Sequence, residues 1–131
     1  MAKGGPGFAR GVRSPNPIAE LDDFISAGRW FEGIVLAGVF LEAWGKKTLR
    51  TFFEEKGYKL PRAIEEANMS SIKRTLRDLN LISQKNESKM QKVLRSRNLL
   101  VHHLDAHYSI KPEQAKEVLQ DAIGVLKVLG A

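Results

Sequence analysis

The chain contains no cysteine. Disulfides, cysteine-bound zinc, iron–sulfur clusters and thiol catalysis are therefore excluded, and this composition fits a reducing cytoplasm. Long hydrophobic runs are lacking too. The most apolar stretch, residues 30–44, is interrupted by Glu32 and Glu42 and is shorter than the ~20 residues that span a bilayer. Residues 1–16 are basic but have no apolar run, so we expect no secretory signal. These absences predict a cytoplasmic protein that does not enter a membrane.

The sequence also lacks the two-residue alternation that predicts β-strands, and it has no internal repeat. Apolar residues instead recur at helical spacing. With 131 residues, 43% of them hydrophobic, the chain is long enough for one domain with its own core. We therefore predict an all-α bundle of four to five helices.

The chain is expected to divide into a short arm and one helical domain. Residues 1–16 are rich in Gly, Pro and Arg and are predicted to form a flexible basic arm. The helical domain covers 17–131. Asn16 followed by Pro17 is typical of an N-cap and a first helical residue, and this helix is predicted to end near Ala27.

A long second helix is predicted over residues 29–56, with Gly57 at its C-terminal cap. Gly33, Gly38 and Gly45 lie inside it. Each weakens a helix by roughly 1 kcal/mol relative to Ala, but glycine also permits close approach of a neighbour. We therefore expect a tight crossing with another helix, or a subunit interface.

Three further helices are predicted from periodicity and capping signals. A connection over residues 58–70 is expected to contain at most one helical turn. A helix that ends at Asn80 is expected to start at Ser70 or Ser71. A helix over 87–104 is expected to start at Asn86 or Ser88, and the last helix at Pro112. On the first of these, Lys73, Arg74 and Arg77 are predicted to face outward. The apolar face of the helix over 87–104 is predicted to comprise Met90, Val93, Leu94, Val101 and Leu104. That of the last helix is predicted to comprise Ala115, Val118, Leu119, Ala122, Ile123, Leu126 and Leu129.

Positive charge is concentrated in the middle of the chain. The formal charge is +6 and the pI about 9.7. Residues 46–97 hold fourteen Lys and Arg against six Asp and Glu, whereas residues 14–45 hold one basic side chain against five acidic ones. A basic block favours an anionic partner such as nucleic acid. The alternative is a solvated surface with no such partner.

The basic block leads into the segment with the strongest candidate residues for chemistry, in which Arg97-Asn98 precedes His102. Arginine holds phosphate charge, and an imidazole moves protons near neutral pH. Cleavage of a phosphodiester needs both groups. The alternative is structural: Arg97 pairs with an acidic residue such as Glu42, and Asn98 and His102 satisfy each other.

The pattern Arg97-Asn98-x-x-x-His102 near the end of a helix resembles the motif of the HEPN superfamily (higher eukaryotes and prokaryotes nucleotide-binding). The pairs Arg97/His103 and Arg95/His102 also fit its wider spacing. The specific likeness covers residues 70–103, within a broader region of 17–128. The resemblance implies an all-α, HEPN-like fold.

The resemblance further implies a ribonuclease that needs no metal or other cofactor and acts as a homodimer, of the toxin or defence type, with an antitoxin protein as a further partner. Arg97 would bind the scissile phosphate, His102 would act as general acid or base, and Asn98 would orient the imidazole or a phosphate oxygen. The substrate-binding residues would be Arg95, His103, Lys92 and Arg77.

Two other functions stay open. A catalytically inactive HEPN-like module would bind RNA, a nucleotide or a protein partner, and a helical dimer would act only as an adaptor. His103 and His107 have an i, i+4 spacing that suits a metal. No third ligand stands at a matching spacing, so we predict no metal site.

Overall fold

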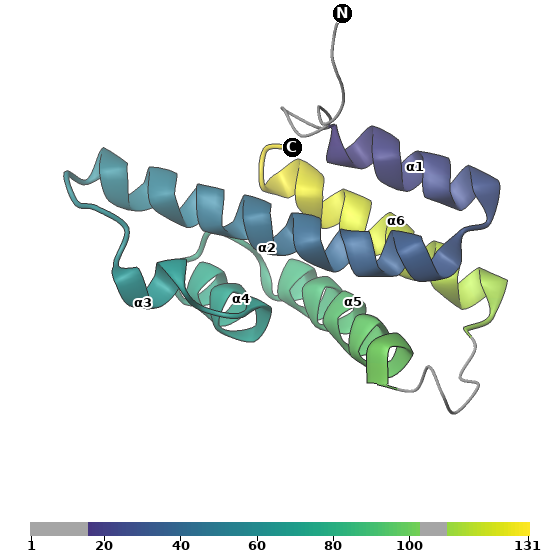
Figure 1. The fold of residues 1–131 in the computed structure, drawn as a ribbon. Coiled ribbons are helices and arrows are strands. Elements are labelled where there is room, and N and C mark those ends of the chain that lie inside the picture. Colours follow the sequence, from purple (N-terminus) through teal and green to yellow (C-terminus); the bar gives the residue numbers. More distant parts are fainter. Residues whose placement is uncertain (1–15, 103–109) are drawn as a thin grey trace, which may run out of the picture.

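The computed structural model describes residues 16–102 and 110–131, and this part of the chain folds into helices without a strand (Figure 1). The all-α prediction is confirmed. There are six helices in the described residues, where four to five were expected, because the connection after the second helix forms a short helix of its own. The helices are α1 (Pro17–Ala27), α2 (Trp30–Glu55), α3 (Arg62–Glu65), α4 (Met69–Asp78), α5 (Gln84–His102) and α6 (Pro112–Val128).

Helix α2 is the central helix of the bundle. It contacts α1, α4, α5 and α6, and α6 in turn contacts α1 and α5. Figure 1 shows α1 on one side of α2 and α4 and α5 on the other, with α6 crossing behind α2. No helix of the described part is long and apolar enough to cross a membrane.

The first helix begins and ends as predicted. The Asn16 Oδ1 atom accepts a hydrogen bond from the Ala19 backbone N–H at 3.1 Å, which satisfies one of the free donors at a helix start. Gly28 closes the helix in the left-handed conformation, with φ of 67°. The arm predicted over residues 1–16 lies outside the described residues except for Asn16.

Two of the α2 glycines allow the close approach expected of them. A Cβ built on Gly33 would lie 3.1 Å from side-chain atoms of Phe24 in α1 and Leu119 in α6. A Cβ on Gly45 would lie 2.7 Å from Cγ2 of Ile72 in α4. Such distances are shorter than normal carbon contacts, so the missing methyl groups bring α2 close to its neighbours.

The starts of α4 and α5 differ from the prediction. The cap of α4 is Asn68, whose Oδ1 accepts from the Ser71 N–H at 3.0 Å, rather than Ser70 or Ser71. Ser83 Oγ accepts from the Asn86 N–H at 3.1 Å at the start of α5, so the helix begins before the expected Asn86 or Ser88. In both cases a polar side chain nearer the N-terminus satisfies the free N–H groups first.

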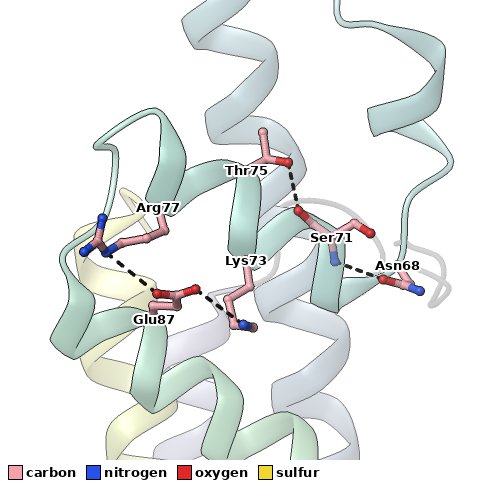
Figure 2. A network of polar contacts seen from close by, with 6 residues as sticks. All are labelled: Asn68, Ser71, Lys73, Thr75, Arg77 and Glu87. Carbon is pink, nitrogen blue, oxygen red and sulfur yellow. Dashed lines mark hydrogen bonds and ion pairs between the residues drawn. The ribbon is translucent and has the colours of Figure 1, made fainter.

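Lys73 was predicted to face outward and is instead buried, with 9% of its surface exposed. Its Nζ atom lies 3.5 Å from Glu87 Oε2 in α5, and Arg77 Nε lies 3.7 Å from Glu87 Oε1 (Figure 2). A buried ammonium group requires an opposite charge close by. Glu87 thus joins two cations of α4 to the first turns of α5.

The core is built mainly from α2, α5 and α6. The predicted apolar face of the last helix, from Ala115 through Leu129, is buried as expected. On α5 the prediction for Val101 is wrong: this side chain is 45% exposed. Leu100, its neighbour on α5, is buried instead. Leu104 lies outside the described residues.

Candidate functional site

The candidate site lies where α5 crosses α2. Its central feature is the surface of α2 at Gly38 on which the Arg97 side chain lies, which we call the Arg97 seat. Arg97 is half-buried and runs across the backbone of Gly38 in α2. A Cβ built on Gly38 would lie 2.8 Å from Cδ, 3.2 Å from Nη1 and 3.6 Å from Nε of Arg97. The stem and the guanidinium therefore both lie against α2 at a place where no side chain intervenes.

The guanidinium has one hydrogen-bond partner within the described residues. Arg97 Nη2 donates to Asn98 Oδ1 over 3.4 Å, which is long for such a bond. Glu42, the acidic partner that the structural alternative named for Arg97, instead pairs with Lys46 at 3.4 Å and is partly exposed. No ion pair between Arg97 and a carboxylate is formed in residues 16–102 and 110–131. Among the described residues, the motif arginine thus has guanidinium donors that no side chain or backbone group accepts from.

His102 ends α5 and is exposed. It follows Arg97 by five positions, which places the two about 140° apart around an ideal helix. No hydrogen bond joins His102 to Arg97 or Asn98 in the part of the chain that the structure describes. One chain therefore does not bring all three motif residues to a single point. His103 lies outside the described residues.

Exposed apolar side chains occur on α2 and α5, the two helices that form the Arg97 seat. Val39 follows Gly38 and is 53% exposed, and Phe31, two turns earlier on α2, is 40% exposed. Val101 lies one turn after Arg97 on α5. Scattered exposed apolar residues are ordinary on a protein surface. Here four of them, Leu99 of α5 included, stand on the two helices that hold the candidate arginine.

The predicted substrate-binding residues differ in how far their charge is already matched. Lys92 Nζ lies 2.8 Å from Asp121 Oδ2 and 2.5 Å from Glu117 Oε2 of α6, and these hydrogen bonds raise the Lys92 pKa above its ordinary value. Arg77 shares Glu87 with Lys73. Arg95 is exposed and makes no ion pair in the described region. Arg95 is thus the best placed of the three to attract an anion.

Two further cavities in the structure have no lining residue from α5. They have volumes of about 580 Å³ and 360 Å³ and share Lys47 and Gly130 in their walls. No group of three or more potential metal ligands occurs among the residues whose placement is described. A third cavity, of about 300 Å³, does have α5 residues in its wall, Lys92 and Ser96, but Arg97 does not line it.

Gly38 is the residue of this site that the sequence did not single out for function. The sequence did contain an indication of its role, since a glycine in an apolar helix indicates close approach of another group. What approaches it could not be read from spacing. No protein-family model, curated protein or solved structure matches the chain.

Proposed function

We propose that this protein is a metal-independent RNA endonuclease of the HEPN type, which works as a homodimer through Arg97, Asn98 and His102. The observation that carries the proposal is the state of Arg97. Its guanidinium lies against α2, and its only hydrogen-bond partner in the described residues is the side-chain amide of Asn98, over a long distance. Arg97 also stands near the same end of α5 as the exposed imidazole of His102. A charge of this kind is suited to a phosphate.

These three residue types suffice for RNA cleavage by internal transfer. The imidazole of His102 takes the proton from the 2′-hydroxyl, and the oxygen attacks the adjacent phosphorus. The bond from phosphorus to the 5′-oxygen breaks, and that oxygen takes a proton from a second imidazole. The products are a 2′,3′-cyclic phosphate and a 5′-hydroxyl end. Arg97 stabilises the negative charge that builds on the phosphoryl oxygens, and Asn98 holds the guanidinium.

A second copy supplies what one chain lacks. Arg97 and His102 are separated around α5, and the reaction needs two proton-transfer groups. A partner that docks on exposed apolar side chains of α2 and α5, such as Phe31, Val39 and Val101, brings a second motif to the same site and covers exposed apolar surface. Arg95 stands seven residues before His102, on the same side of α5, and attracts RNA. Toxin or defence activity, with an antitoxin as partner, belongs to the same proposal.

The test is cleavage of mixed cellular RNA in EDTA by the wild type, Arg97→Ala and His102→Ala. We expect losses of at least about 100-fold in each variant, the scale of a missing general acid–base group or charge stabiliser. Arg62→Ala is the matched control, because Arg62 is an exposed arginine on α3 that pairs with Glu66, and it should cleave like the wild type. Equal cleavage by all four proteins would refute the assignment of the site.

A catalytically inactive RNA-binding module is the second candidate. It is favoured by one observation: the Arg97 guanidinium bonds to Asn98 and not to His102 within the chain. Such a module would bind RNA with an affinity that falls as salt rises and weakens in Arg97→Ala. It would show no cleavage in any buffer, and His102→Ala would bind as the wild type does.

A further inference from the structure

The helical glycines of this protein face different groups, and Gly38 alone faces a charged residue of the candidate site at close range. Gly33 and Gly45 oppose apolar core side chains. Gly124 in α6 has only the flexible end of Lys89 nearby, with Nζ at 3.6 Å from its built Cβ. Gly38 faces three atoms of Arg97, the nearest at 2.8 Å. The missing methyl group at position 38 is thus space that the Arg97 side chain occupies.

The backbone does not require glycine at this position. Gly38 lies in the middle of α2, and the only glycines of the described region with positive φ are Gly28, Gly57 and Gly130. An alanine would favour the helix. The contact with Arg97 is therefore the one feature of Gly38 in the structure that an added methyl group would disturb.

We propose that Gly38 is a positioning residue for Arg97: because it has no side chain, the guanidinium can lie directly on the α2 backbone at the site. This inference rests on the proposed function for its catalytic consequence, but not for the contact itself. A methyl group at position 38 would overlap Cδ of Arg97. Because the arginine side chain is flexible and the helix backbone is not, the Arg97 side chain would move away from position 38 and α2 would stay in place.

The experiment compares Gly38→Ala with Gly124→Ala. Both add a methyl group to a helical glycine, and only the first adds it against Arg97. The first readout is the NMR signal of the Arg97 Nε–H group, which is assigned by its loss in Arg97→Lys. We expect this signal to shift in Gly38→Ala and to stay in place in Gly124→Ala. An unmoved signal in a folded Gly38→Ala protein would overturn the proposal.

The second readout is RNA cleavage under saturating and limiting RNA. A misplaced phosphate-binding group lowers the rate of the chemical step, so we expect kcat to fall about tenfold or more in Gly38→Ala, with a smaller change in KM. Gly124→Ala should retain the wild-type kcat. In an Arg97→Ala background, Gly38→Ala should have no further effect on cleavage, because the residue that it displaces is gone.

A stability cycle keeps the proposal testable if Gly38→Ala unfolds easily. In the Arg97→Ala background the overlap is absent, so Gly38→Ala should raise the melting temperature through helix propensity. An equal loss in both backgrounds would show that Gly38 serves another contact and would overturn the proposal. Absence of cleavage by the wild type would refute the proposed function alone, since the NMR signal and the cycle report the Gly38–Arg97 contact directly.

Discussion

The ion pairs of Glu87 offer a quantitative test of how the bundle holds a buried charge. Lys73 is 9% exposed, and its nearest carboxylate is Glu87 across the α4–α5 contact (Figure 2). The substitution Glu87→Gln keeps the shape of the side chain and removes its charge. It leaves the Lys73 ammonium group buried and facing a neutral amide.

The expected cost lies between two limits. Breaking a fully buried pair costs about 3–5 kcal/mol, and an exposed pair is worth about 0–1 kcal/mol. The Lys73 side chain is 11% exposed, but Glu87 is 26% exposed and Arg77 38% exposed, so solvent screens part of the cluster. We expect Glu87→Gln to lower the free energy of unfolding by about 1–2 kcal/mol at pH 7. For a chain of this size that is a fall in Tm of about 3–8 °C.

The assay is thermal unfolding followed by circular dichroism, with Glu66→Gln as control. Glu66 pairs with Arg62 at 3.0 Å, but both side chains are largely exposed, so removing its charge should cost less than about 0.5 kcal/mol. The double variant Lys73→Met with Glu87→Gln provides the second arm. Replacing the stranded cation by an apolar side chain should recover part of the lost stability.

Two results would refute this reasoning. If Glu87→Gln lowers the Tm no more than Glu66→Gln, Lys73 is solvated well enough without its carboxylate. If Lys73→Met lowers the Tm further in the Glu87→Gln background, the ammonium group contributes contacts that outweigh its desolvation. In either case the carboxylate is not what permits Lys73 to be buried.

Two other predictions concern the contacts of α2 and of Lys92. Gly45→Ala should lower the free energy of unfolding by up to about 2 kcal/mol, as overpacking against Ile72 exceeds the gain in helix propensity; a higher denaturation midpoint in urea would contradict it. The pKa of Lys92 is raised above 10.5 by its carboxylate partners, so its stabilisation is complete below pH 10.5 and is lost as pH rises through the folded-state pKa. The stability difference between wild type and Lys92→Met, under about 1 kcal/mol because the side chain is 42% exposed, should therefore shrink as pH rises above 10.5, and a constant difference would argue against it.

Local signals in the sequence predicted the helices well. The Asn16–Pro17 start of α1 and the buried face of α6 follow from capping and periodicity, which depend on residues within a few positions of one another. The start of α4 was misplaced because Asn68 is as good a cap as Ser70, and only the folded chain shows which one is used. Capping competition of this kind is local but nearly balanced in energy.

Long-range contacts explain the rest of the differences. Lys73 is buried because Glu87, fourteen residues later, comes to it across two helices. The placement of Arg97 on Gly38 joins residues that are far apart in sequence. The order of Arg97, Asn98 and His102 pointed to a candidate site, but which face each side chain takes depends on how α5 crosses α2. Spacing on one helix contains no information about that crossing.

The position of α6 has a consequence for how the protein is made. This helix contacts α1, α2 and α5, and it contributes many of the buried residues of the core. A chain emerging from the ribosome presents α1 to α5 before residues 112–128 have been synthesised. Until then the apolar surfaces that α6 covers are open to water and to other chains. The nascent protein should therefore depend on chaperones during the interval before α6 emerges, and the bundle should complete its folding only after that.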